Sequence, residues 1–297
     1  MRNAFIEELV ALAAVHHHIA LVVGDLGYSV VEPFAESFPD RFINAGVAEQ
    51  NMTGLAAGMA SEGYHVFTYS IANFPTFRCA EQIRNDVAYH NLPVTVVAVG
   101  GGLAYGALGY SHHAVQDYAL MRVMPHMLIA APGDPMEVRA CMRYLVKHPG
   151  PSYLRLGKAG EPNFHDVPPD VAPGRWLRGR VGEGRRALLS TGAGLQIAMD
   201  WTARDDFAGH DVYSLPLWSM ADKPAQAAQL RAYDEVVTVE DHLQDGGFGS
   251  WLLEALCVSP DLRSRVTDLA LNPVVCGTVG SQATLNALGG LPTGPTR

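Results

Sequence analysis

Residues 93–100, PVTVVAVG, form a short and almost wholly apolar run that ends in glycine. Three similar runs occur in the same half of the chain, namely IALVVGD (19–25), VFTYS (66–70) and HMLIAAP (126–132). Between these runs the apolar residues take a helical spacing, at about 3–15, 48–62, 78–90, 115–123 and 134–147. Apolar strands that alternate with helices are typical of a parallel sheet covered on both faces. The pattern predicts a doubly wound α/β domain over residues 1–158.

The next stretch, residues 159–184, is rich in proline, glycine and charge, which favours a linker. The alternation then resumes, with strands expected in RRALLSTGAG (185–194), HDVYSLPL (210–217) and DEVVTVEDH (234–242). Helices are expected over 195–208 and 222–232. We therefore predict a second, smaller α/β domain over residues 185–297, with a loosely held tail in LGGLPTGPTR (288–297).

The composition is that of an ordinary globular protein, with 48% hydrophobic and 17% charged residues among 297. A formal net charge of −9 argues against nucleic acid or an anionic membrane as a partner. No apolar stretch reaches about 18 residues, and the N-terminus does not read as a signal peptide. The four cysteines are far apart and form no CxxC pair, so we expect neither disulfides nor a zinc site, and a cytoplasmic location.

Two glycine-rich turns that follow strands, residues 100–109 and 191–198, do not keep the spacing of a dinucleotide-binding loop. Adjacent histidines at 16–18 point in different directions, so no metal site is expected there. The segment GVAEQNM (46–52) is more informative, because it places Glu49 where a helix should begin. Asn44 or Gly46 could cap that helix. From the residue alone, Glu49 is explained by the favourable interaction of an acid with a helix N-terminus.

Three segments together point to a family. DRFINAGVAEQNMTGLAAGMASEG, FRCAEQIRNDVAYHNLPVTVVAVGGG and LGYSHHAVQDYALMRVMPHMLIAAPGDPMEV occur in this order, and EDH…GGFGSWLLEAL follows later. They resemble the C-terminal half of transketolases, above all the small subunit of split transketolases. The resemblance implies a pyrimidine-binding domain followed by a transketolase C-terminal-type domain, and thiamine diphosphate as cofactor.

The family's diphosphate-binding GDG motif does not occur in this sequence. The resemblance therefore implies that a partner chain, equivalent to the N-terminal half, binds the diphosphate and Mg²⁺. It also implies self-association, in an α2β2 assembly. This chain would hold the pyrimidine ring and is expected to bind no metal itself.

The resemblance assigns roles to several residues that contact the cofactor. Glu49 matches the catalytic carboxylate that hydrogen-bonds the pyrimidine N1′ atom and selects the reactive tautomer. Phe74, four residues before Arg78, matches an aromatic residue that stacks on the pyrimidine, and Phe77 is a second candidate. Asp25 matches a position near the cofactor, at the end of the first strand. Ordinary core packing is the alternative explanation for both phenylalanines.

Other residues are implied to contact a sugar-type substrate, which can carry a phosphate. His112 matches a substrate-facing histidine that can donate to an oxyanion or shuttle protons. His113 stands where the family has glutamine and is expected to face the substrate as well. Arg2 and Arg155 fall at positions of phosphate-binding arginines, although solvated surface arginines would explain them equally.

The sequence departs from the family at two substrate positions. Gly100 replaces a histidine and Leu108 replaces an aspartate, so two polar contacts to a sugar hydroxyl are lost. A pocket built for a hydroxyl derives much of its selectivity from such contacts. The loss favours a donor or acceptor that is more apolar, deoxygenated or differently shaped, so an ordinary role in the pentose phosphate pathway is not expected.

The resulting hypothesis is the small subunit of a transketolase-type transferase that moves a two-carbon ketol or related acyl unit. One alternative is the β-subunit of a 2-oxo acid decarboxylating or 1-deoxyxylulose 5-phosphate synthase-like enzyme. Another is a non-catalytic partner that keeps the fold without the chemistry.

Overall fold

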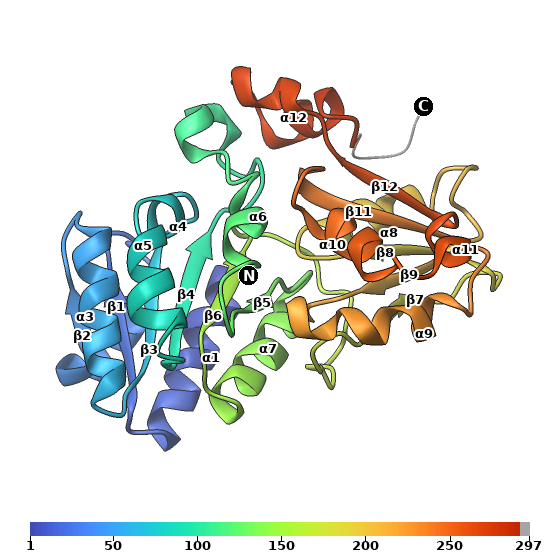
Figure 1. Cartoon of the computed structure of the whole chain (residues 1–297). Coiled ribbons are helices and arrows are strands. Elements are labelled where there is room, and N and C mark those ends of the chain that lie inside the picture. The colour runs from blue at the N-terminus through green and yellow to red at the C-terminus, as the bar shows by residue number, and fades with distance from the viewer. Residues whose placement is uncertain (292–297) are drawn as a thin grey trace.

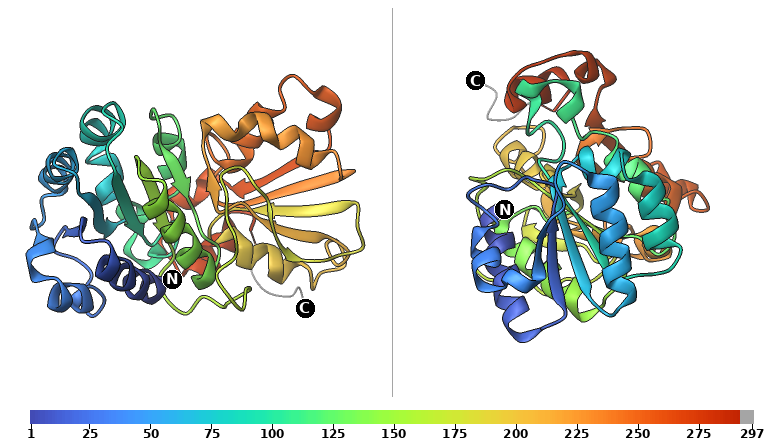
Figure 2. Two further views of the ribbon diagram at one scale, coloured as in Figure 1. Left: turned by 90° about the horizontal axis from the view of Figure 1, so that it is seen from below. Right: turned by 90° about the vertical axis from the view of Figure 1, so that its left-hand side faces the viewer.

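The computed structural model describes residues 1–291, which form two mostly parallel sheets that lie side by side (Figures 1 and 2). The first sheet is built from β1 (Ile19–Val23), β2 (Phe42–Asn44), β3 (His65–Ile71), β4 (Val94–Val99), β5 (Leu128–Ala130), β6 (Ser152–Leu156) and β10 (Leu217–Trp218). Its seven strands take the order β10-β5-β6-β4-β3-β1-β2, and β10 is antiparallel to its neighbour. The predicted α/β class is confirmed.

Long helices cover both faces of this sheet. Its helical segments are α1 (Arg2–Val15), α2 (Glu32–Ser37), η1 (Pro39–Arg41), α3 (Glu49–Ser61), α4 (Phe74–Phe77), α5 (Ala80–Gln82), η2 (Ile83–Ala88), η3 (Gly106–Leu108), η4 (Tyr110–His112), α6 (Asp117–Met121) and α7 (Pro135–Lys147). α1 and α7 pack together on one face, where Leu21 and Val23 of β1 point. Val22 points to the other face, which α3 covers (Figure 2). This alternation explains why the strands read as continuous apolar runs.

The second sheet follows in the chain. Its strands are β7 (Leu177–Arg180), β8 (Arg186–Ser190), β9 (Asp211–Ser214), β11 (Glu235–Leu243) and β12 (Val266–Leu271), in the order β12-β11-β8-β9-β7. The helical segments are α8 (Gly194–Trp201), η5 (Met220–Ala225), α9 (Gln226–Leu230), α10 (Phe248–Ala255), α11 (Pro260–Arg263), η6 (Pro273–Gly277) and α12 (Gln282–Leu288). α12 lies against η3 of the first part of the chain (Figure 1). Gly280, just before α12, donates its N–H to the Gly106 carbonyl of η3 at 3.3 Å.

Several elements differ from the sequence-based expectation. The stretch 159–184 contains β7, an edge strand antiparallel to β9, and residues 152–156 form the buried central strand β6. β6 was not predicted as a strand, because Arg155 interrupts its apolar run. The helix expected over 78–90 is divided into short segments that end in the π-helix η2. Of the tail expected to be loose, Leu291 is buried and residues 292–297 lie outside the described residues.

Candidate active site at the strand ends

Glu49 begins α3, directly after the loop that follows β2. Only 3% of it is exposed. The sequence had suggested Asn44 or Gly46 as the helix cap, but neither residue caps the helix. Instead, Asn44 Oδ1 accepts hydrogen bonds from the backbone N–H groups of Asp25 and Gly46. Asn44 therefore shapes the loop before the helix and leaves the Glu49 carboxylate free to face a neighbour.

The two carboxylate oxygens of Glu49 have different surroundings. Oε2 accepts a hydrogen bond from Arg78 Nη1 at 3.1 Å, whereas Oε1 is buried with no hydrogen-bond partner within residues 1–291. Leaving a buried acceptor unpaired costs about 1–3 kcal/mol, so natural proteins rarely keep one without a reason. The free oxygen fits a group that binds here and donates a hydrogen bond.

Arg78 connects Phe74 to this carboxylate, because it contacts both residues. Phe74 is the first residue of α4, which follows β3, and the Arg78 guanidinium carbon lies 4.4 Å from its ring centroid. Phe77 lies at the other end of the same helix. It is 47% exposed, and no ring contact of Phe77 occurs in the described part of the chain. Of the two phenylalanines, Phe74 is therefore the one that the structure joins to Glu49.

His112 packs against Phe74. Their ring centroids are 5.3 Å apart in an edge-to-face arrangement, and Ser111 Oγ lies 3.0 Å from His112 Nδ1. The Asn73 side chain donates to the backbone carbonyls of Ser111 and His113, so α4 and the η4 loop are fastened together. Burial, with a smaller effect of His113, lowers the pKa of His112. Its imidazole is therefore mostly neutral at pH 7.

Tyr105 packs against His112, and Lys158 lies over Tyr105. Neither Tyr105 nor Lys158 had been singled out from the sequence. Tyr105 lies 6.4 Å from His112 by ring centroids, and Lys158 Nζ lies 5.0 Å from the Tyr105 centroid. Gly100 has a φ of +80°, and a Cβ there would meet the Tyr105 ring at 2.1 Å. The tyrosine thus occupies the space that a side chain at position 100 would need. The sequence held no signal for this packing, because neither the positive φ of Gly100 nor the position of the Tyr105 ring can be read from it.

We call Glu49, Arg78, Phe74, His112, Tyr105 and Lys158 the strand-end row. Its members follow β2, β3, β4 and β6, which are parallel, so they gather beyond the carboxyl ends of these strands. Ligands of open α/β sheets bind at this edge. Arg2 is near the Lys158 end, since its Nε donates to Lys158 O at 2.9 Å.

Arg155 does not join this row, and its expected role in phosphate binding is not supported by its surroundings. The residue is 2% exposed, and its guanidinium donates to Asp117 at 2.7 Å and to Asp241 at 2.5 Å. It also donates to the Tyr118 hydroxyl and to the Ala114 carbonyl. Because all five N–H groups are engaged inside the protein, Arg155 is an internal counter-ion between the two sheets.

Three other predicted residues also lie apart from the row. His113 is buried, with Nε2 3.3 Å from the Gly106 carbonyl, and so packs under the loop rather than facing outward. Leu108 is 58% exposed at the end of η3. Asp25 follows β1 with a φ of +56°, and its Oδ1 accepts from the Asn44 amide and the Tyr28 hydroxyl. Asp25 therefore braces the loop before Glu49.

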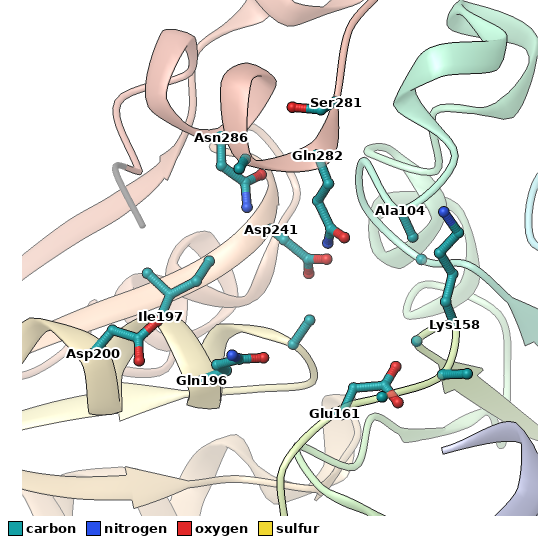
Figure 3. Close-up of a pocket in the computed structure, with 16 residues that line it drawn as sticks. Ala104, Lys158, Glu161, Gln196, Ile197, Asp200, Asp241, Ser281, Gln282 and Asn286 are labelled. Atoms are coloured by element: carbon teal, nitrogen blue, oxygen red, sulfur yellow. The ribbon is translucent and has the colours of Figure 1, made fainter. Parts of the chain in front are cut away.

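A separate cavity of about 460 Å³ lies between the two sheets (Figure 3). Lys158 and Glu161 line it from the first sheet, whereas Asp241, Gln282 and Asn286 line it from the second. Of the strand-end row, only Lys158 reaches this cavity. A smaller surface pocket of about 430 Å³ is lined by residues 47–51 and Arg78, and adjoins the Glu49 end of the row.

Comparisons with known proteins identify the family of the chain. Residues 1–160 match the family described as transketolase, pyrimidine binding domain. The chain is 33% identical to the putative transketolase C-terminal section of Methanocaldococcus jannaschii, covering 92% of this chain and 87% of that protein. It is 32% identical to one of the subunits of the apulose-4-phosphate transketolase from Phocaeicola vulgatus, covering 87% and 84% of the two chains.

Two further relatives are informative. The chain is 30% identical to 1-deoxy-D-xylulose-5-phosphate synthase of Clostridium perfringens, but it spans 41% of that protein and the alignment covers 86% of this chain. A solved structure described as a split-gene transketolase in an inactive β4 tetramer superposes with a TM-score of 0.82 at 30% identity, covering 98% of this chain and 93% of that one.

The fold and the matched region define a protein with a transketolase pyrimidine binding domain. The chain belongs to the transketolase family. The relatives that it matches over most of their length are a transketolase C-terminal section and a transketolase subunit, and transketolases are transferases. Within residues 1–291, no helix is long and apolar enough to cross a membrane, and no group of three or more potential metal ligands occurs.

Proposed function

We propose that this chain is the pyrimidine-binding subunit of a thiamine diphosphate-dependent transketolase-type transferase. The observation that carries the proposal is the buried carboxylate of Glu49, which has an unpaired oxygen and is joined through Arg78 to the aromatic ring of Phe74 at the strand ends. The matches to split transketolase subunits support the same conclusion. When bound, the cofactor supplies the nucleophilic carbon that carries the two-carbon unit.

The residues of the strand-end row would each do a distinct part of the work. Glu49 would hold a proton at the pyrimidine N1′ atom, in a setting where water cannot compete for it. Phe74 would stack on the flat ring, a contact worth about 0.5–1.5 kcal/mol beyond its buried area. His112 would donate to the carbonyl oxygen of the sugar, since its loop presents it beside Phe74.

The far end of the row is suited to an anionic group on the substrate. Lys158 carries a charge at the end of a flexible side chain, and Arg2 is held next to it by the Lys158 carbonyl. We propose that these two cations, and not Arg155, bind a phosphate or a similar oxyanion. The substrate class would then be a phosphorylated sugar.

This chain provides only part of the proposed assembly. A partner chain equivalent to the N-terminal half of transketolase would hold the diphosphate and Mg²⁺, because the sequence lacks the GDG motif. We propose an α2β2 assembly in the cytoplasm, and the division into domains 1–158 and 185–297 joined by residues 159–184 belongs to the same proposal. The relatives named as subunits support the requirement for a partner.

The test is to produce the chain together with its partner and to titrate thiamine diphosphate by calorimetry. We expect one saturable site per pair, with binding weakened in Glu49→Gln and turnover of a ketose phosphate lost. A pair that binds no cofactor, or a Glu49→Gln pair with unchanged turnover, would rule the proposal out. Partner activity that does not depend on addition of this chain would instead indicate a non-catalytic role.

A second candidate function is a synthase of the 1-deoxyxylulose 5-phosphate type, or a 2-oxo acid decarboxylating enzyme. The relative from Clostridium perfringens favours it, as does the lack of a polar side chain at Gly100 and Leu108, where the resemblance places a histidine and an aspartate. A pyruvate donor needs fewer hydroxyl contacts than a ketose. Product analysis with pyruvate and with a ketose phosphate as alternative donors separates the two functions.

A further inference from the structure

The Arg78 side chain makes two contacts at once. Its Nη1 donates to Glu49 Oε2 at 3.1 Å, and its guanidinium carbon lies 4.4 Å from the Phe74 ring centroid. These are the two residues to which the proposed function assigns the pyrimidine ring. We propose that Arg78 is a gating residue, whose guanidinium takes the place of the pyrimidine in the free chain and must move away for thiamine diphosphate to bind.

The chemistry of the two groups explains why one can stand in for the other. A guanidinium is planar, offers N–H donors in its plane and stacks on aromatic faces. A pyrimidine ring that donates from N1′ to a carboxylate and stacks on a phenylalanine makes the same pair of contacts. Glu49 Oε1 is free in this structure, so the two groups compete for the face of Phe74 that the Arg78 guanidinium covers. Both cannot stack on that face together, so their binding is mutually exclusive.

The surroundings of Arg78 allow it to move while its two partners stay in place. The Arg78 side chain is 52% exposed, whereas that of Glu49 is 3% exposed. No hydrogen bond of the Arg78 side chain other than that to Glu49 occurs within residues 1–291. Rotation about its side-chain torsions can therefore carry the guanidinium into the adjoining surface pocket, which Arg78 itself lines. No backbone change is needed.

The gate has a measurable consequence for cofactor affinity. When a binding-competent state is populated only in part, the apparent dissociation constant equals the intrinsic constant divided by that fraction. If Arg78 covers the site about two-thirds to nine-tenths of the time, its removal should tighten binding by about three- to tenfold. The gate would also keep the buried carboxylate of Glu49 partly compensated before the partner chain arrives.

The experiment compares thiamine diphosphate titrations of the two-chain complex carrying wild-type, Arg78→Ala, Arg78→Lys or Arg84→Ala chains. Arg84 is exposed and donates to the neighbouring Asn85, so its loss removes the same charge without opening the site. We expect Arg78→Ala to lower the dissociation constant about three- to tenfold. Arg84→Ala should leave it unchanged or raise it slightly. Arg78→Lys should fall in between, because lysine keeps the charge but cannot stack as a plane.

This inference rests on the proposed function, and the outcomes separate the two. If wild-type and all variants fail to bind the cofactor, the proposed function fails. If wild-type binds but Arg78→Ala binds equally or more weakly, the gate is overturned and Arg78 becomes a cofactor contact or a structural residue. Denaturant unfolding of the free chain shows whether the variants still fold. A lower midpoint is expected for Arg78→Ala because buried Glu49 loses its cation, so the gate is tested by the dissociation constant and not by the midpoint.

Discussion

Arg155 Nη1 lies 2.5 Å from Asp241 Oδ1, so a strand of the first sheet and a strand of the second are joined by a buried ion pair. Asp117, at the start of α6, accepts from the same guanidinium at 2.7 Å. One arginine thus compensates two buried carboxylates. The position of the second sheet relative to the strand-end row depends on this cluster.

The first prediction follows from that cluster. Arg155→Leu would leave Asp117 and Asp241 buried without their cation, and breaking such a pair costs about 3–5 kcal/mol. We expect a loss of this size in the free energy of unfolding, measured by urea denaturation. The matched control is Arg185→Leu, because the Arg185–Asp234 pair is largely exposed and its loss should not change the midpoint measurably. Equal effects of the two variants would contradict the assignment.

The second prediction concerns pH and a buried carboxyl at the start of α7. Burial raises the pKa of Glu137 from its ordinary 4.5 to about 7. Its Oε2 accepts from Gly133 N and Ser214 Oγ. Because the pKa of Glu137 is higher in the folded state than in the unfolded state, its contribution to stability is fully present below pH 4.5 and is lost as pH rises through about 7.

The measurement is the free energy of unfolding at pH 5 and pH 8 for wild-type and Glu137→Gln. A shift of this size corresponds to a difference of up to about 3 kcal/mol, and glutamine cannot ionise. The variant should therefore lose less stability than wild-type over this interval. The difference between the two chains isolates Glu137 from other buried acids such as Glu240, whose pKa burial also raises. Parallel pH curves would contradict the prediction.

The third prediction tests the packing of Tyr105 on Gly100. Gly100→Ala should push the Tyr105 ring out of the strand-end row, because the new Cβ would lie 2.1 Å from it. Gly63→Ala is the control, since Gly63 also has a positive φ but an added Cβ meets nothing within 4 Å. Both variants carry backbone strain of about 1–2 kcal/mol. Only Gly100→Ala should also change the KM of the two-chain enzyme for its sugar substrate.

The fourth prediction concerns His112 as a proton donor or acceptor. His112→Asn keeps the size of the side chain but does not titrate, so kcat should fall about 10²–10⁴-fold. Burial holds the pKa of His112 below 6.5, so the neutral imidazole and the activity that needs it should persist below pH 6.5 in wild-type. A pH–rate profile checks both points. A variant that keeps the acid limb of the wild-type profile would exclude His112 as the titrating group.

The fifth prediction separates Lys158 from other surface lysines. Lys158→Met should raise KM for a phosphorylated substrate about tenfold or more, since a charge-assisted hydrogen bond contributes about 1.5–3 kcal/mol. KM for the unphosphorylated analogue should stay nearly constant. Lys147→Met, at the exposed end of α7, serves as the control. Equal changes with both substrates would show that Lys158 acts through the fold and not through the anion.

Much of the architecture could be predicted from the sequence. The apolar runs that became β1, β3, β4 and β5 were recognised because strands buried on both faces contain few polar residues. β6 was missed because Arg155 interrupts its short apolar run, and a buried arginine is tolerated only where distant carboxylates compensate it. Local patterns do not contain that information.

Part of the candidate site could likewise be predicted from the sequence, and part could not. The motif around Glu49 and the order of Phe74 and His112 indicated the family and the kind of chemistry, and the family match confirmed the family. The sequence could not place Tyr105 over Gly100, nor distinguish Lys158 at the end of the row from Arg155 inside the protein. Those facts depend on which strands lie next to each other in the sheet.

The sequence by itself determined the fold class, the family and the candidate carboxylate, because these follow from local periodicity and from motifs of adjacent residues. The tertiary structure alone decided that Arg78 lies between Glu49 and Phe74 and that Arg155 is internal. The physical reason is that these contacts join residues from different strands and helices. Packing selects such contacts from many that the sequence would permit equally well.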